Sequence, residues 1–210
     1  MGIIFNILSF KLKAREKTVT QKESKKLLLE KLYEPYKKCF LCPLATPTRK
    51  FVVFGDGNPD AKFMIIGEAP GKDENEQGIP FVGKSGRFLT KILTQLNINR
   101  EDIFITNSVK CRPPNNRKPT AIESKTCKDI LLINQINIIQ PKAICTLGSA
   151  ATESLLAKPI KMNAIHGTTL FYDKIILFPT YHPAYIMRNP KKRDQFINDL
   201  QKFFSLFDSK

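Results

Sequence analysis

Short polar or glycine-rich motifs follow three of the strand-like apolar runs in this chain. GEAPG, which contains Glu68, follows KFMIIG; Asn107 lies where a second apolar run ends; and His182, in YHPAY, follows a third run. Loops at the carboxyl ends of parallel strands converge on one crevice in an open α/β sheet. We therefore expect these three side chains, together with Phe81 in the motif PFVG, to face one small ligand. A flat ring would use an aromatic face, a two-way amide and an imidazole.

Strand patterns alternate with helix patterns along most of the chain. The predicted strands are residues 51–54, 62–67, 102–109 and 143–147, and a pair at 168–172 and 174–179 that turns at Asp173. The predicted helices are part of 11–38, a helix capped by Ser85, a helix from Thr120 to about Ile138, and residues 149–156 and 194–207, whereas 69–83 is predicted to be a loop. This alternation is typical of a three-layer α/β/α fold with a central, mostly parallel four-stranded sheet.

Length and charge narrow the class of protein further. At 210 residues the chain can bury the core of one domain. We assign residues 36–210 to that domain and residues 1–35 to an N-terminal extension that is helical in part. The 34 Lys and Arg residues outnumber 19 Asp and Glu residues, which gives a formal net charge of +15 and favours a polyanionic partner such as nucleic acid. Biased base composition in a Lys-, Ile- and Asn-rich chain is the alternative explanation.

The five cysteines do not form the even set of a secreted disulfide framework. The sequence contains no transmembrane span, and its apolar first ten residues lack the basic residues and the cleavage site of a signal peptide. We therefore expect a cytoplasmic protein with no membrane partner, and we expect it to act as a monomer.

Four of the cysteines have spacings that suit a metal site. Cys39 and Cys42 form a CxxC pair, which Cys111 and Cys127 could complete. Spacing alone does not separate zinc from an iron–sulfur cluster, because four cysteines hold either one. Buried cysteines without a ligand are the simpler alternative. Cys145 lies inside the apolar run AICTLG and is expected in the core.

The residues of the expected crevice also have ordinary structural explanations. The small residues of GEAPG would let backbone N–H groups approach a ligand, but glycine also serves ordinary turns. Glu68 could be a solvated loop charge, and Phe81 could be a core residue. Asn107 could be a turn residue or a helix cap, and His182 could be part of a plain loop.

Taken together in their order and spacing, GEAPG, PFVG, TNSVKCRPP and YHPAY, interleaved with the four cysteines, resemble the family 4 uracil-DNA glycosylases. This family is the iron–sulfur branch of the uracil-DNA glycosylase superfamily, and the resemblance covers roughly Tyr36 to the C-terminus. It implies a uracil-DNA glycosylase-like fold and an enzyme of base excision repair that flips deoxyuridine out of DNA and hydrolyses its N-glycosidic bond. It also implies one 4Fe–4S cluster with a structural role, held by Cys39, Cys42, Cys111 and Cys127.

The resemblance also implies roles for the residues of the crevice. Glu68 would position the attacking water and stabilise the cationic sugar, and His182 would donate to uracil O2, so both are implied catalytic residues. Phe81 would stack on the extruded base. Asn107 would accept from uracil N3–H and donate to O4, a pattern that cytosine does not match. The implied uracil-binding residues are Gly67, Glu68, Ala69, Phe81, Asn107 and His182.

Some positions differ from the wider superfamily or from the family pattern. Ala69 stands where the best-known branch of the superfamily carries its catalytic Asp, whereas Glu68 is typical of family 4. Lys72 and Asn75 stand where the family often has acidic residues, so we assign them no catalytic role. The loop after the third motif reads NNRKP, without the histidine of the covalent DNA-trapping relatives, and turnover is therefore expected.

Basic residues flank two of the motifs. Their phosphate contacts would supply salt-dependent affinity that does not depend on DNA sequence. The residues after the HP dipeptide are predicted on an exposed loop, where they suit a wedge that fills the gap left by a flipped base; a helix start packed on the core is the alternative. The expected DNA contacts are Arg112, Arg117, Lys118, Tyr185, Ile186, Arg188, Lys191 and Lys192, with Lys110, Met187 and Arg193 as neighbours in the same two segments.

Two other function classes compete with this interpretation. A non-catalytic nucleic-acid-binding module would explain the charge and the cysteines, but not the four residues of the crevice. A phosphate-ester hydrolase would need a metal-binding carboxylate cluster or a P-loop lysine, and the sequence shows neither. We therefore predict a monofunctional uracil-DNA glycosylase that acts on uracil-containing DNA and needs no lyase lysine.

Overall fold

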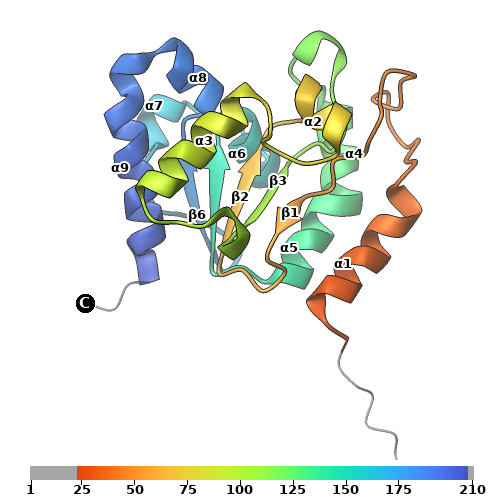
Figure 1. Ribbon diagram of the computed structural model, residues 1–210, viewed down its shortest axis with the longest axis horizontal. Coiled ribbons are helices and arrows are strands. Elements are labelled where there is room, and N and C mark those ends of the chain that lie inside the picture. Colours follow the sequence, from red (N-terminus) through yellow and green to blue (C-terminus); the bar gives the residue numbers. More distant parts are fainter. Residues whose placement is uncertain (1–22, 208–210) are drawn as a thin grey trace, which may run out of the picture.

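A mixed six-stranded sheet forms the centre of the computed structural model, which describes residues 23–207 (Figure 1). The strands, in spatial order, are β1 (Asp56–Gly57), β3 (Phe104–Asn107), β2 (Phe63–Gly67), β4 (Ala143–Leu147), β6 (Ile175–Thr180) and β5 (Leu170–Tyr172). The four inner strands run parallel, and β1 and β5 are antiparallel to their neighbours. The predicted α/β class is confirmed, but the predicted four-stranded sheet is not, because an antiparallel strand extends the sheet at each edge.

Helices cover both faces of the sheet (Figure 1). They are α1 (Lys25–Tyr33), α2 (Lys72–Gln77), α3 (Lys84–Gln95), α4 (Ala121–Cys127), α5 (Ile133–Ile139), α6 (Ser149–Leu156), α7 (Met162–Ile165), α8 (Pro183–Arg188) and α9 (Arg193–Phe204). Short turns of 3-10 or π-helix are η1 (Glu34–Tyr36), η2 (Arg100–Asp102), η3 (Pro114–Asn116), η4 (Lys128–Leu132), η5 (Pro190–Lys192) and η6 (Ser205–Phe207).

Alternate side chains of β2 divide between the two faces, as the period of a strand requires. Ile65 packs in one apolar cluster with residues of α3 and α9. Met64 and Ile66 pack in the other cluster with residues of α1, α5 and α6. Because both faces of the sheet are covered, the inner strands read as continuous apolar runs rather than as alternating patterns.

The parallel strands bring the motifs to one edge of the sheet. Register pairs Gly67, the last residue of β2, with Asn107, the last residue of β3. β6 ends at Thr180, and His182 follows it after one intervening residue. Motifs that are far apart in the sequence therefore meet at the carboxyl ends of these strands, as expected for an open α/β sheet.

The segment 69–83 is not a plain loop, because it contains α2. The glycines that suggested a loop stand at the ends of this helix: Gly71 is its N-cap, and Gly78 ends it in a left-handed conformation with φ 74°. The next helix, α3, begins at Lys84 after Gly83 as N-cap, so the prediction that Ser85 caps it is wrong.

Two further predictions concern a helix start and a hairpin, and both are confirmed. Thr120 Oγ1 accepts the backbone N–H of Glu123 at 3.3 Å, and Glu123 Oε2 accepts the N–H of Thr120 at 2.8 Å, which makes a capping box. The helix that follows is interrupted by the π-helical segment η4 before it continues as α5. β5 and β6 pair as a hairpin around Asp173, whose φ is 49°.

The strand predicted at residues 51–54 is absent from the part of the chain that the structure describes. The backbone N–H of Val53 does bond to the carbonyl of Lys110 at 2.7 Å, but the sheet ladder begins only at Asp56. At the N-terminal side, α1 lies against α5: Leu29 is buried in the core, and Lys25 Nζ donates to the carbonyl of Ile139 at 2.7 Å.

The apolar first ten residues, and the start of the helix predicted within 11–38, lie outside the described residues, and the division at residue 35 stays a prediction. Within residues 23–207, no helix combines the length and the apolar composition that crossing a bilayer requires.

Candidate active site

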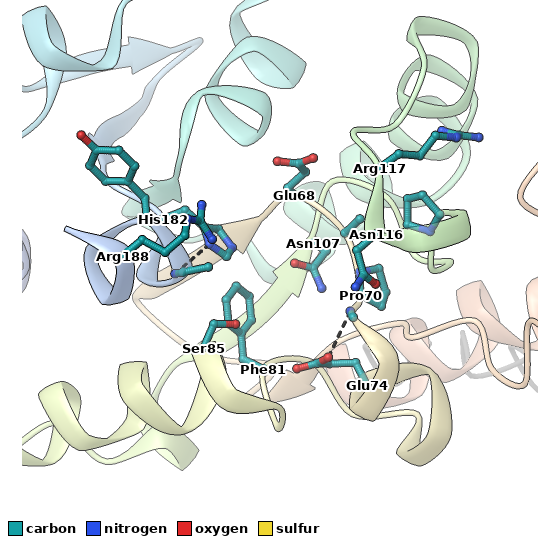
Figure 2. A pocket seen from close by; sticks show the side chains of 15 residues that line it. Glu68, Pro70, Glu74, Phe81, Ser85, Asn107, Asn116, Arg117, His182 and Arg188 are labelled. Atoms are coloured by element: carbon teal, nitrogen blue, oxygen red, sulfur yellow. Dashed lines mark hydrogen bonds between the residues drawn. The ribbon is translucent and has the colours of Figure 1, made fainter. Parts of the chain in front are cut away.

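A cavity of about 420 Å³ opens at the carboxyl ends of the inner strands (Figure 2). Four predicted site residues, Glu68, Phe81, Asn107 and His182, line it, and Ala69 contributes to its wall. Figure 2 shows their side chains surrounding one space, although they come from four separate segments. A second cavity of about 640 Å³ adjoins the first, because Glu68, His182 and Tyr185 line both.

Gly67 keeps this cavity open by lacking a side chain. A Cβ atom at Gly67 would lie 2.4 Å from Asn107 Oδ1 and 2.4 Å from Phe81 Cζ. Any larger residue would therefore have to displace both side chains. Both side chains therefore pack against the place that a Gly67 side chain would fill.

Asn107 carries the clearest mark of a missing ligand. Its side chain is buried, with 2% exposed, yet Oδ1 finds no hydrogen-bond partner anywhere in residues 23–207. A buried acceptor without a partner is rare, because its lost hydration is not replaced. Since Asn107 lines the cavity, a ligand that donates an N–H at this place would satisfy it.

Phe81 occupies an unusual backbone conformation next to this amide. Its φ is 55°, in the left-handed region that non-glycine residues rarely adopt, and its side chain is 5% exposed. The ring lies 6.0 Å from the ring of His182, centroid to centroid, at an interplanar angle of 33°. Conformational outliers of this kind cluster at ligand sites.

His182 is poised as a neutral hydrogen-bond donor. It is the N-cap of α8, and its Nδ1 accepts the backbone N–H of Ala184 at 3.1 Å. Burial, with a smaller contribution from the charge of Arg188, lowers its pKa to about 4. A neutral ring whose Nδ1 accepts must carry its proton on Nε2, so Nε2–H is the donor that remains for a ligand.

Glu68 follows directly on β2 and is half-buried at the mouth of the cavity. Burial raises the pKa of its carboxyl group; Glu153 raises it further, while Lys118 partly offsets both effects. A carboxylate that is partly removed from water interacts more strongly with any positive charge that forms beside it.

Glu74, to which the sequence analysis gave no role, ties two motifs of the cavity together. Its Oε2 accepts the N–H of Gly71 in GEAPG at 3.0 Å (Figure 2), and its Oε1 accepts the N–H of Gly83 in PFVG at 2.8 Å. The side chain is buried and lines the cavity. A signal was present, because an acidic residue three positions after a helix N-cap suggests a capping box.

The four predicted metal ligands belong to one cluster beside the cavity wall. Cys111 and Cys127 are buried in it, and Cys39 and Cys42 pack against it, whereas Cys145 lies in the core on β4, as expected. Burial raises the pKa of Cys111 to about 11 and that of Cys127 to about 12.

One of these sulfurs already accepts a hydrogen bond, since the backbone N–H of Lys110 donates to Cys127 Sγ at 3.2 Å. Within residues 23–207, no group of three His, Cys, Asp or Glu side chains is arranged to hold a metal ion.

Lys110 does not face solvent, contrary to its predicted place among basic DNA-contacting residues. Its side chain is fully buried, and Nζ donates to Thr106 Oγ1, to the carbonyl of Asn107 at 2.8 Å and to Gln135 Oε1. Burial lowers its pKa to about 7, although Cys127 opposes this shift. Lys110 thus binds the backbone carbonyl of Asn107 from within the core and does not extend from the surface.

The other basic residues of the CRPP segment make contacts within the protein. Arg117 pairs with the buried Glu123 through two hydrogen bonds of 2.8 and 2.7 Å. Arg112 Nε donates to Asn116 Oδ1 at 2.8 Å, and Lys118 lies 3.0 Å from Glu153. Arg117 also lines the cavity, so its pairing does not remove it from the site.

The residues after the HP dipeptide form α8 rather than an exposed loop. Ile186 is 1% exposed and belongs to the apolar core, so the prediction that it stands ready as a DNA wedge is wrong. Tyr185 lines the cavity and stacks on Tyr181 at 5.3 Å and 17°. Met187 and Arg188 are the exposed residues of this helix.

Farther along, Lys191 is exposed, while Lys192 Nζ donates to the hydroxyl of Tyr181 at 3.0 Å. Of the basic residues expected at the DNA after β6, Arg188, Lys191 and the neighbouring Arg193 therefore remain exposed.

Comparison with known proteins places this geometry in a family. The profile of the "Uracil DNA glycosylase superfamily" matches residues 54–204, which contain Glu68, Phe81, Asn107 and His182. The chain belongs to the uracil-DNA glycosylase superfamily. The four cavity residues are therefore arranged on a uracil-DNA glycosylase fold.

Similar curated proteins narrow the branch of the superfamily. A "Type-4 uracil-DNA glycosylase" of Thermotoga maritima is 43% identical over 166 residues, which cover 77% of this chain and 84% of that protein. Proteins of the same name from Pyrobaculum aerophilum and Saccharolobus solfataricus are 42% and 41% identical. Those two alignments cover 84% and 87% of this chain and 93% and 88% of the respective relatives. The predicted family resemblance is confirmed.

Proposed function

We propose that this chain is a type-4 uracil-DNA glycosylase that hydrolyses the N-glycosidic bond of deoxyuridine and leaves an abasic site in DNA. Membership of the superfamily and identities of 41–43% to proteins of that name support the reaction class. The observation that carries the choice of base is the buried, unpartnered Oδ1 of Asn107 beside the ring of Phe81. A non-catalytic DNA-binding module would have no use for this pair.

Uracil fits the cavity by its pattern of donors and acceptors. Its N3–H donates to Asn107 Oδ1, and its O4 accepts from the Asn107 amide group. Cytosine presents an acceptor at N3 and a donor at its exocyclic amine, so the fixed amide would oppose it at both atoms. Because buried polar groups left without hydrogen-bond partners are costly, such a site favours uracil over cytosine by about 10⁴–10⁵. Phe81 stacks on the base, and Gly67 leaves the space between ring and amide.

The chemistry follows from where charge develops when the bond breaks. Negative charge grows on uracil O2, and the Nε2–H of the neutral His182 donates to it there. Positive charge grows on the sugar, where the carboxylate of Glu68 stabilises it and orients the attacking water. The water oxygen bonds to C1′ as the bond from C1′ to N1 breaks, and the electron pair of that bond leaves with the uracil. The proton that the water loses passes to the Glu68 carboxylate and on to solvent, and the uracil anion takes up a proton from solvent.

For the cysteines, we propose one 4Fe–4S cluster held by Cys39, Cys42, Cys111 and Cys127. Cysteine is the residue type that such a cluster takes, and all four cysteines belong to or pack against one apolar cluster, where the backbone N–H of Lys110 donates to Cys127 Sγ. Because no three of these side chains are arranged for a metal ion in the described residues, they would have to draw together to hold the cluster. A bound cluster would tie together the CxxC segment, the CRPP segment and α4, which carry these cysteines. Its contribution is therefore structural, and it carries no step of the base excision.

For DNA, we propose that Arg188 and Lys191 contact phosphates directly. Both side chains are exposed; Arg188 lines the cavity, and Lys191 follows it three residues later in the sequence. Arg112, Arg117, Lys118 and Lys192 are further proposed contacts, although each now has a partner within the protein. Tyr185 is the proposed contact for the nucleotide beside the flipped base. The enzyme would act on uracil-containing DNA in the cytoplasm, as a monomer.

The test is a glycosylase assay on oligonucleotides with a single uracil in U·G, U·A and single-stranded form. Free uracil and an alkali-labile site should appear in equal amounts, whereas Glu68→Gln should bind the same duplex and release little uracil. Binding without release by the wild-type protein, loaded with iron, would favour the non-catalytic module instead.

A further inference from the structure

Phe81 is held in a conformation that it would not adopt by itself. With φ at 55°, its backbone lies in the left-handed region, where an L-residue crowds its own carbonyl group. Such a residue persists only where the surrounding structure fixes it. The contacts that fix the Phe81 backbone therefore determine the position of its ring.

Arg100, in η2, grips the two peptide groups on either side of Phe81. Its Nη1 donates to the carbonyl of Phe81 at 3.1 Å, and its Nη2 donates to the carbonyl of Pro80. The rotation of these two peptide groups about the Phe81 Cα is what defines the φ and ψ of that residue. A planar, rigid guanidinium that binds both carbonyls fixes this rotation, which a lysine ammonium would do less well.

Other contacts hold Arg100 and Phe81 in turn. Asp56 on the edge strand β1 lies 3.7 Å from Arg100 Nε, and the Arg100 side chain is only 21% exposed. Helix α3 also packs directly on this backbone, since a Cβ at Gly86 would lie 2.0 Å from the Phe81 carbonyl carbon and oxygen. Arg100 does not line the cavity, so it cannot touch the base.

We infer that Arg100 is a positioning residue for base recognition, which acts by locking Phe81 in its left-handed conformation. This inference rests on the proposed function, because it assumes that Phe81 stacks on uracil. Without Arg100 the peptide groups relax, and the ring no longer stands opposite Asn107. The loss should therefore fall on binding of the base, and much less on contacts with the DNA backbone.

The experiment compares Arg100→Gln with Arg87→Gln in the iron-loaded full-length protein. Arg87 is the matched control, since its Nη1 donates to the neighbouring carbonyl of Val82 at 2.9 Å but its side chain is 67% exposed. Two quantities are measured: inhibition by free uracil, and affinity for a duplex that carries an abasic-site analogue. The first reports the base pocket, and the second reports the DNA surface.

Arg100→Gln should weaken inhibition by free uracil by about tenfold or more, the scale of a lost aromatic stack on a base. Its affinity for the abasic duplex should stay within about twofold, as should both quantities for Arg87→Gln. A lysine at position 100 can bind one carbonyl but cannot hold both in a fixed plane. Inhibition of Arg100→Lys by free uracil should therefore be weaker than for the wild type and stronger than for Arg100→Gln.

A folded Arg100→Gln with wild-type inhibition by uracil overturns the inference, and so does an equal loss in both quantities. If Arg100→Gln does not fold, Arg100→Lys decides by the same two measurements. A wild-type protein that neither releases nor binds uracil would refute the proposed function itself, so the two failures can be told apart.

Discussion

Replacing Gly67 by alanine should close the base pocket while leaving the fold in place. The added Cβ would lie 2.4 Å from both Asn107 Oδ1 and Phe81 Cζ, about 1 Å inside the 3.4 Å at which ordinary contact begins. The backbone of β2 cannot give way, because β3 and β4 pair with it on both sides. The ring and the amide must therefore both move by about 1 Å, and a misplacement of that size costs on the order of 10² in rate.

The assay is a single-turnover measurement with enzyme in excess over a duplex that carries one uracil. We expect the rate for Gly67→Ala to fall by about 100-fold, and overpacking to lower the free energy of unfolding by about 1–3 kcal/mol. Gly55→Ala is the control for lost stability: its Cβ would lie 2.8 Å from Phe104 and its φ of 153° disfavours alanine, whereas Gly55 does not line the cavity. It should lose stability but keep its rate at a temperature where it is folded.

A folded Gly67→Ala that cleaves at the wild-type rate would show that uracil does not bind between Phe81 and Asn107. An equal loss of rate in Gly55→Ala would show that activity follows stability and not the pocket. Either result would refute the reasoning, whichever family the chain belongs to.

Three further outcomes follow from the charges and thiols of the site. The single-turnover rate should fall as pH drops through the pKa of Glu68, because only the ionised carboxylate stabilises the cation, and burial raises this pKa above its ordinary 4.5. Glu68→Gln should be slower by about 10² or more, and its rate–pH profile should lack this acidic fall in rate. Cys127→Ala should lose iron and solubility together, whereas Cys145→Ala should keep the iron, as measured by iron analysis and visible absorbance. Stoichiometric zinc in the native protein would contradict the cluster. Replacing Arg188 and Lys191 with alanine should make the plot of log binding constant against log salt concentration less steep, by about 2 in slope, for uracil-containing and uracil-free duplexes alike.

Much of the fold could be predicted because buried parallel strands are continuous apolar runs with polar residues just beyond them. This pattern located β2, β4 and β6, and it placed Glu68, Asn107 and His182 at one edge of the sheet. The edge strand β1 has only two residues, Asp56 and Gly57, and no apolar pattern that could reveal it. In 69–83, glycines at both ends of a short helix gave the same signal as glycines within a loop.

The environment of single side chains could not be predicted in the same way. Lys110 has the charge of a surface residue, but three acceptors, one of them the carbonyl of Asn107, satisfy it in the core. Ile186 was interpreted from its place after a motif, whereas its helical position directs it inward. The left-handed φ of Phe81 depends on Arg100, which is 19 residues away in the sequence. Contacts of this kind come from the tertiary structure and leave no local pattern.

The most direct test of the account is a crystal structure of the protein with uracil bound. We expect the base in the cavity at the carboxyl ends of β2 and β3, stacked on Phe81, with its N3–H bonded to Asn107 Oδ1 and its O2 near His182 Nε2. Uracil in the adjoining cavity beside Asn163 and Tyr181, with Asn107 Oδ1 still unpaired, would contradict the account.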